Sequence, residues 1–252
     1  MRRTAVSSQQ RGLLEVIALH AADAERAEAG GADRIELVGT MDHSGLSPEP
    51  ALVGEVRRAT SLPIRAMLRL RDGFGTDGGE VTRLRGLLAD YRATGADGVV
   101  LGFLNGHTDV DTGVVTELIG DSPDFGWTFH RAIDSCLEAD RNWRTLRTLP
   151  GLDQVLTAGA ARGVSDGLDD LVARAKADPF ARATIMAGGG LLPEHVPWLA
   201  RAGVRAFHIG SAARPLGSWK AYIDPELVGS WRRLVDDAVA RAAGAEPSGR
   251  AH

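Results

Sequence analysis

The chain has 252 residues, enough to bury a sizeable core without disulfides. Hydrophobic residues make up 44% and charged residues 25%, as is ordinary for a soluble globular protein. The formal net charge is −4 and no basic run occurs, which argues against a nucleic-acid partner. No apolar stretch of membrane-spanning or signal-peptide length is present, and the single cysteine cannot form an internal bridge. These features predict a cytoplasmic protein with no membrane partner.

Eight short apolar runs recur along the chain and are predicted to be β-strands. In order they are Leu13–Leu19, Arg34–Val38, Ile64–Arg69, Gly98–Leu104, Trp127–Arg131, Gln154–Thr157, Thr184–Gly188 and Ala206–Ser211. The segments between and after them have helical character. The predicted helices are Ala21–Ala29, Val53–Ala59, Glu80–Thr94, Gly113–Ile119, Glu138–Leu149, Ser165–Ala177, Pro193–Ala202 and Pro225–Ala242. Ser47 is the expected N-cap of the second helix, with Pro48 at its first position.

A glycine-containing joint precedes four of the predicted strands, which indicates one repeated supersecondary unit. The joints are Gly30-Gly31-Ala32-Asp33, Gly95-Ala96-Asp97, Gly151-Leu152-Asp153 and Gly203-Val204-Arg205. Eight strand–helix repeats predict an α/β fold, the (β/α)8 TIM barrel, as a single domain. We expect the barrel to span residues 12–242, with disordered tails at 1–11 and 243–252.

Polar residues gather where the predicted strands end, which is where this fold builds its active sites. The candidate catalytic residues are Glu15, Glu36, His130, Asp134 and His208. His130 or a glutamate would act as general acid or base. An unpaired carboxylate inside apolar strands costs several kcal/mol, so Glu15 and Glu36 are expected to meet cations, hydrogen-bond donors or water, with Arg69 and His130 as candidates. An ion-pair layer that plugs the barrel mouth and catalyses nothing is the alternative.

A second set of residues suits an anionic ligand, because guanidinium groups and glycine amides both bind oxyanions. The candidate substrate-binding residues are Arg69, Arg71, Arg131, Thr157, Gly188, Gly189, Gly190, Gly210 and Ser211. The glycines follow the seventh and eighth strands, the loops that often hold a phosphate in such barrels. Turns that need glycine only for their geometry would give the same pattern.

Three other patterns have simpler interpretations. The stretch 73–78 matches G-x-G-x-x-G, but the repeat count is wrong for an open dinucleotide-binding sheet, so a flexible loop is predicted. The stretch 107–113 partly resembles a calcium loop without its later glutamate, and Asp111 or Thr112 is expected to cap a helix. Soft copper(I) ligands are few: Cys136, Met67 and Met186. No zinc spacing occurs, although His130, His208, Glu15 and Glu36 could bind a harder ion.

Several stretches taken together resemble the CutC family over residues 14–211. They are Leu14-Glu15-Val16, Ala29-Gly30-Gly31-Ala32-Asp33-Arg34-Ile35-Glu36-Leu37, Gly45-Leu46-Ser47-Pro48, Gly95-Ala96-Asp97-Gly98-Val99-Val100, Thr128-Phe129-His130-Arg131-Ala132 with Asp134, Leu156-Thr157-Ala158-Gly159, Ile185-Met186-Ala187-Gly188-Gly189-Gly190 and Phe207-His208. The resemblance implies a cytoplasmic TIM barrel, often a homodimer, that serves copper homeostasis by binding or trafficking copper.

The chain departs from the family pattern at two places. Members commonly carry cysteines, proposed as copper(I) ligands, just after the two barrel glutamates, where this chain has Ile17 and Val38. It also reads Arg69-Leu70-Arg71 where a proline is usual. The barrel-mouth residues are kept while the thiols are lost. The alternative hypothesis is therefore an enzyme of unassigned activity that acts on a small anionic or phosphorylated metabolite, or a protein that binds one without turnover.

Overall fold

The eight strands form one closed parallel barrel in which each strand pairs with its neighbours in sequence, β1 through β8. The computed structural model describes residues 11–120 and 125–244. The strands are β1 Leu13–Ala18, β2 Arg34–Leu37, β3 Ile64–Met67, β4 Gly98–Leu101, β5 Gly126–Phe129, β6 Leu152–Thr157, β7 Ile185–Ala187 and β8 Ala206–Ile209. The predicted single-domain TIM barrel is confirmed.

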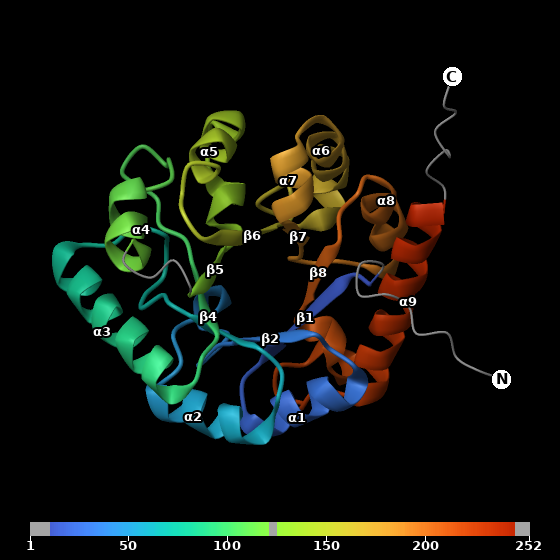
Figure 1. The fold of residues 1–252 in the computed structure, drawn as a ribbon, viewed down its shortest axis with the longest axis horizontal. Coiled ribbons are helices and arrows are strands. Elements are labelled where there is room, and N and C mark those ends of the chain that lie inside the picture. Colours follow the sequence, from blue (N-terminus) through green and yellow to red (C-terminus); the bar gives the residue numbers. More distant parts are fainter. Residues whose placement is uncertain (1–10, 121–124, 245–252) are drawn as a thin grey trace.

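Helices connect successive strands and lie around the outside of the barrel (Figure 1). They are α1 Ala21–Gly30, α2 Pro50–Ala59, α3 Gly78–Thr94, α4 Thr112–Ile119, α5 Ala139–Leu146, α6 Val164–Ala177, α7 Pro179–Thr184, α8 Val196–Arg201 and α9 Pro225–Gly244. Short 3-10 helices occupy Asp42–Ser44 (η2), Arg131–Ser135 (η3), Pro193–His195 (η4), Ser211–Ala213 (η5) and Pro215–Gly217 (η6). Most of these short helices follow strands and so shape the loops at the barrel mouth.

The main apolar core lies between the strands and the helices, because alternate strand residues point outward. Leu14 and Val16 of β1 and Leu37 of β2 are completely buried in this layer. The residues that alternate with them face the barrel interior and include Glu15 and Glu36. The interior is therefore polar in part, and each charged group in it needs a partner.

One such group crosses the barrel. Arg65 of β3 is buried and pairs with Asp153 of β6. Its side chain passes over Gly98 and Gly126, where an added Cβ would lie 2.8 Å and 2.6 Å from Arg65 atoms. Glycine on β4 and β5 therefore provides the space that lets an arginine span two intervening strands.

Of the two predicted helix starts that depend on a capping residue, the start of α4 was correct and the start of α2, where Pro48 and Pro50 are both possible first residues, was wrong. Asp111 caps α4 as predicted, since its carboxylate accepts a hydrogen bond from the Val114 N–H at 3.1 Å. The Ser47–Pro48 start of α2 was wrong, because the helix begins at Pro50 with Glu49 as N-cap. Ser47 Oγ instead accepts the Arg69 N–H at 2.9 Å, which fixes the loop after β3.

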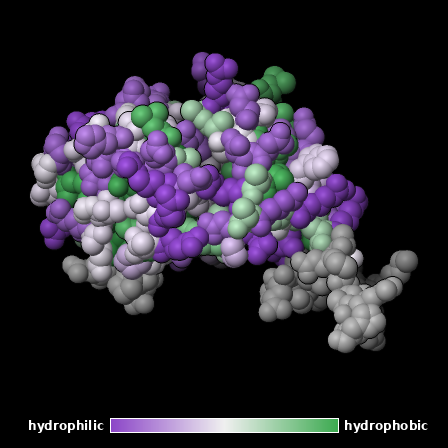
Figure 2. Space-filling model, turned by 90° about the horizontal axis from the view of Figure 1, so that it is seen from above, coloured by the Kyte–Doolittle hydropathy of each residue, from purple (hydrophilic) through white to green (hydrophobic). Residues whose placement is uncertain are grey.

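The remaining differences concern element ends. Most strands stop one to three residues before the predicted ends, helix α7 was not predicted, and α9 runs to Gly244 instead of ending at 242. Most of the predicted tails, residues 1–10 and 245–252, lie outside the described part of the chain. Among the described helices, none is both long and apolar enough to cross a membrane. Figure 2 shows a face covered mostly by hydrophilic side chains, with hydrophobic ones scattered among them.

Candidate ligand-binding site at the barrel mouth

A cavity of about 470 Å³ opens at the carboxyl ends of the strands. Of the residues predicted from the sequence, it is lined by Glu36, Arg69, His130, Arg131, Asp134, Gly189, Gly190, His208, Gly210 and Ser211. Met41, Met67, Phe74 and Trp219 add apolar walls that the sequence reasoning did not anticipate. A cavity of mixed polarity with convergent charged groups is what a small-molecule site requires. A second cavity, of about 550 Å³, lies outside the barrel beside α5 and α6 and is lined by few of the site residues predicted from the sequence.

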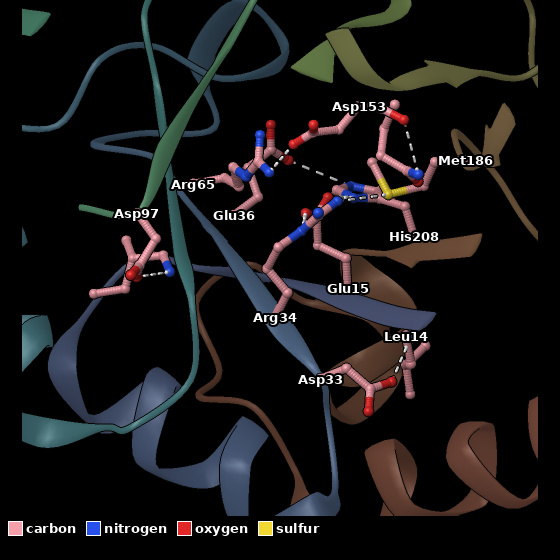
Figure 3. A network of polar contacts seen from close by, with 12 residues as sticks. Leu14, Glu15, Asp33, Arg34, Glu36, Arg65, Asp97, Asp153, Met186 and His208 are labelled. Carbon is pink, nitrogen blue, oxygen red and sulfur yellow. Dashed lines mark hydrogen bonds and ion pairs between the residues drawn. The ribbon is translucent and has the colours of Figure 1, made fainter. Parts of the chain in front are cut away.

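Glu15 lies beneath the cavity in a buried ion cluster. Arg34 donates from Nε to one Glu15 oxygen, and His208 Nδ1 lies 2.8 Å from the other. Strand pairing explains the contacts, because Glu15 is directly opposite Arg34 on β2 and His208 on β8. Figure 3 shows the three side chains pointing toward one another inside the barrel. The sequence expectation that Arg69 and His130 partner the two glutamates was therefore wrong.

Arg34 could have been found from the sequence. It precedes Glu36 by two positions on one strand, and period-two alternation places both side chains on the same face. The guanidinium also lies with Nη2 3.5 Å from Met186 Sδ, so a strand methionine fills space beside the ion pair. Arg34 is therefore the cation that allows Glu15 to be buried.

The two barrel glutamates have opposite electrostatic environments. Burial alone would raise the pKa of Glu15, but Arg34 and His208 outweigh it and lower the pKa to about 2. Burial raises the pKa of Glu36 to about 7, helped by repulsion from Glu15. The Glu15 hydrogen bond and the two carboxylate charges raise the pKa of His208 despite its burial. Glu15 is thus a fixed anion, whereas Glu36 is poised to exchange a proton near neutral pH.

Glu36 is also incompletely bonded. Its Oε2 lies 3.4 Å from His208 Nε2, and its Oε1 is buried with no hydrogen-bond partner among the described residues. A buried polar atom without a partner costs about 1–3 kcal/mol, so its presence on a cavity wall indicates a place for a ligand atom.

Arg69 and Arg131 approach the cavity from the loops after β3 and β5, and both are held in place. Arg69 donates to the backbone carbonyls of Gly45 at 3.2 Å and Gly73 at 3.0 Å, and its guanidinium lies 5.2 Å from the Phe74 ring centre. Arg131 donates to the carbonyl of Ala161 at 2.9 Å. Fixed guanidinium groups lose little entropy when they bind an oxyanion.

Asp134 and Thr157 are engaged with each other and with Arg131. One Asp134 oxygen accepts from Thr157 Oγ1, and the other accepts from Arg131 Nε at 2.8 Å and from the Ala158 N–H at 2.9 Å. Both side chains therefore position Arg131. Asp134 lines the cavity and Thr157 does not, and the hydrogen bonds of both favour a positioning role over the catalytic and substrate-binding roles expected from the sequence.

His130 directly follows β5 and caps η3. Its Nδ1 accepts a hydrogen bond from the Ala132 N–H at 3.2 Å, and its Nε2 is buried without a partner among the described residues. Burial and the nearby Arg69 charge lower the pKa of His130 to about 3. The imidazole is neutral at physiological pH, which disfavours the proton-exchange role proposed for it from the sequence.

Besides Glu15 and Thr157, two further predicted residues, Arg71 and Gly188, do not line the cavity. Arg71 is half exposed and pairs with Glu80 at 3.0 Å on the outside of the loop after β3. Gly188 does not line the cavity, and a Cβ added there would lie 2.7 Å from Leu156 and 2.8 Å from His208. Gly189 has φ +88 and a Cβ there would lie 2.6 Å from Arg131, so this position needs glycine for both conformation and space.

The metal donors of the described residues do not form a copper(I) site. Glu15, Glu36 and His208 have oxygens and nitrogens within 4.8 Å of one another, but Arg34 already occupies Glu15 and these donors are hard or borderline. Ile17 and Val38 pack with Met67 in an apolar cluster at the mouth. Cys136 lines the outer cavity, and burial raises the pKa of its thiol to about 11.

These features define a (β/α)8 barrel with a polar ligand cavity at the carboxyl ends of its strands. The CutC family model matches residues 13–213, and the chain belongs to the CutC family. A family protein CutC from Xanthomonas axonopodis pv. citri is 35% identical over 233 residues, which cover 90% of this chain and 96% of the relative. One from Klebsiella pneumoniae is 34% identical and covers 78% of each chain.

Two solved structures share the fold. The first, from Streptococcus agalactiae and described as a proposed copper homeostasis protein CutC, has a TM-score of 0.71 and 22% identity, and the match covers 79% of this chain and 98% of that one. The second, a thiamine phosphate pyrophosphorylase from Pyrococcus furiosus, has a TM-score of 0.57 and 15% identity, covering 91% and 97%. At these identities the likeness concerns the fold alone.

Proposed function

We propose that this chain serves copper homeostasis, and that it does so by binding a small anionic molecule at the barrel mouth. Membership of the CutC family supports the first part, because the family resemblance implies a role in copper homeostasis. The second part depends on one observation: Arg69 and Arg131 line the same cavity as the glycine backbone at 189–190. Two immobilised guanidinium groups beside a glycine backbone favour a phosphate or carboxylate ligand.

Binding of glycerol 3-phosphate, measured by isothermal titration calorimetry, tests the anion site. We expect Arg131→Ala to weaken binding at least about tenfold, because a charge-assisted hydrogen bond is worth about 1.5–3 kcal/mol. Arg71→Ala is the matched control and should leave binding unchanged, since Arg71 does not line the cavity. Equal losses in both variants, or no binding to the unaltered protein, would overturn the anion site.

An anaerobic copper(I) titration against a chromophoric chelator tests how copper enters the function. With no thiolate at the mouth, we expect no tight stoichiometric binding, and Cys136→Ala should behave like the unaltered protein. Tight binding that survives Cys136→Ala would instead support direct copper handling and contradict the anion-centred proposal.

The proposal includes a cytoplasmic homodimer, as the family resemblance implies. Light scattering coupled to gel filtration should give twice the chain mass of 26.7 kDa. A mass of one chain at micromolar concentration would remove the dimer from the proposal without affecting the anion site.

A further inference from the structure

The most informative unsatisfied atom at the mouth is His130 Nε2. The ring is 5% exposed, and Nδ1 accepts the Ala132 N–H at 3.2 Å. A backbone N–H can only donate, so Nδ1 carries the lone pair and the single proton of the neutral ring is on Nε2. His130 therefore presents an N–H donor of fixed orientation on the wall of the cavity.

The surroundings keep His130 in this form. The Phe74 and Phe129 rings lie 5.4 Å and 6.1 Å from the imidazole centre, which excludes water from its faces. The guanidinium of Arg69 lies on the same cavity wall and opposes a second positive charge. Protonating Nδ1 would also break the cap on η3. A neutral imidazole that donates one hydrogen bond polarises a carbonyl oxygen without having to give up its proton.

Glu36 supplies the complementary group. It lines the same cavity, its Oε1 has no hydrogen-bond partner among the described residues, and His208 contacts its other oxygen. A carboxylate with one unpartnered oxygen can accept a proton from a ligand atom and return it, because its ionisation lies close to neutral pH. The donor and the acceptor belong to residues that line one cavity, which allows one ligand to meet them at two different atoms.

From this geometry we infer that the cavity takes a small anionic carbonyl compound, with its carbonyl oxygen on His130 Nε2–H, and that Glu36 exchanges a proton with the adjacent carbon. This inference rests on the anion site proposed above. Glu36 removes the proton, the C–H electron pair forms a C=C bond, and the carbonyl electron pair moves to the oxygen. These movements enolise the compound, and the enolate oxygen accepts the His130 hydrogen bond. Return of a proton from Glu36 to carbon restores the carbonyl, so one cycle exchanges the carbon-bound proton without net chemical change. No oxidant, reductant or other reactant is consumed.

A matched pair of probes separates the inference from the anion site. Dihydroxyacetone phosphate has a carbonyl, whereas 3-hydroxypropyl phosphate has a methylene at the same carbon and therefore no oxygen there to accept the His130 hydrogen bond. We expect the carbonyl compound to bind about tenfold more tightly, as one well-placed hydrogen bond provides. Equal affinity would overturn the inference and leave the anion site standing. Failure of both probes to bind would overturn both proposals.

Two isosteres of His130 test the donor itself. Asn places an oxygen near the Nδ1 position, so His130→Asn keeps the cap on Ala132 and lacks the Nε2 donor. Gln places an N–H near the Nε2 position, so His130→Gln keeps the donor and loses the cap. The preference for the carbonyl compound should disappear in His130→Asn and persist in His130→Gln. The reverse pattern would assign His130 a purely structural role.

Nuclear magnetic resonance gives two readouts independent of affinity. In protein with 15N-labelled histidine, His130 should show the Nε2–H tautomer throughout pH 5–8, and a protonated or Nδ1–H ring would overturn the inference. Dihydroxyacetone phosphate in D2O should exchange its carbon-bound proton faster with the unaltered protein than with Glu36→Gln purified in parallel. Tighter carbonyl binding with equal exchange rates would overturn the proton transfer and keep the hydrogen bond.

Discussion

Two buried charged clusters among the described residues differ in whether they border the cavity at the barrel mouth. In the cluster outside the strands, Asp23 of α1 and Arg214 after β8 are both fully buried. In the interior cluster, formed by Glu15, Arg34, Glu36 and His208, two members line the cavity, and one Glu36 oxygen has no hydrogen-bond partner among the described residues. Buried ionic groups stabilise little by themselves, so we interpret the cluster away from the cavity as structural and the cluster on the cavity wall as a place for a ligand.

The outer cluster ties distant segments together. Asp23 accepts from Arg214 Nη2 at 2.7 Å and from the backbone N–H groups of Leu19 and Ile223 at 3.0 Å. Arg214 also donates to the Ala221 carbonyl at 2.6 Å. Only its Nε lacks an acceptor among the described residues. This cluster holds the loop between β8 and α9 against β1 and α1.

The largest expected effect is on the outer cluster. Asp23→Asn removes the anion from a fully buried pair, so we expect the free energy of unfolding to fall by about 3–5 kcal/mol in urea titrations. Asp140→Asn is the control, because Asp140 is mostly exposed where it meets Arg174 and should cost less than about 1 kcal/mol. Similar losses in the two variants would contradict a structural role for the buried pair.

A smaller effect of opposite sign is expected in the interior cluster. The pKa of Glu36 rises from 4.5 in the unfolded chain to about 7 in the folded one. The folded state therefore holds the proton more tightly, and its stability falls as pH rises from 4.5 to 7. Glu36→Gln cannot titrate, so its free energy of unfolding should exceed that of the unaltered protein by about 1–3 kcal/mol at pH 8.

Urea titrations at pH 5 and pH 8 check this difference. The advantage of Glu36→Gln should shrink as pH falls through the window, because the unaltered Glu36 is then protonated and neutral. A difference that does not change with pH would show that Glu36 ionises normally.

The smallest expected effect concerns the residue between the clusters. Trp219 lies with its ring centre 5.0 Å from the Arg214 guanidinium and lines the cavity. Trp219→Leu should lower the free energy of unfolding by about 1 kcal/mol, since a partly buried cation–π contact is worth that much. Glycerol 3-phosphate affinity, measured alongside, should change less than in Arg131→Ala. A larger loss of affinity than of stability would show that the outer cluster also shapes the site.

The barrel could be predicted from the sequence because the spacing of the apolar runs and the periodicity of the helices are visible along the chain. Each strand, glycine joint and crossover is encoded by neighbouring residues. Eight such strand–helix units in succession form one closed parallel barrel. The predicted strand ends also brought Glu36, Arg131 and His208 to one cavity. The spacing of the strands could not predict which side chains form ion pairs. The partners of Glu15 depend on the register between β1 and its two neighbouring strands.

The ion pair of the outer cluster could not be predicted from the sequence. Asp23 resembles any acidic residue in the first turn of a helix, where the helix dipole favours it. Arg214 is one arginine among many in a loop. Their 191-residue separation means that only the folded chain shows them to be partners.

Closure of the barrel has a consequence for biosynthesis. Glu15 and His208 are 193 positions apart and meet only when β8 pairs with β1. A chain still lacking β8 leaves Glu15 and Glu36 without this imidazole, so water must solvate their carboxylates until the final strand arrives. Contacts of such long sequence separation form late in folding. A nascent or truncated chain therefore lacks the assembled site at the barrel mouth, and a ligand that needs this site binds only the complete, folded chain.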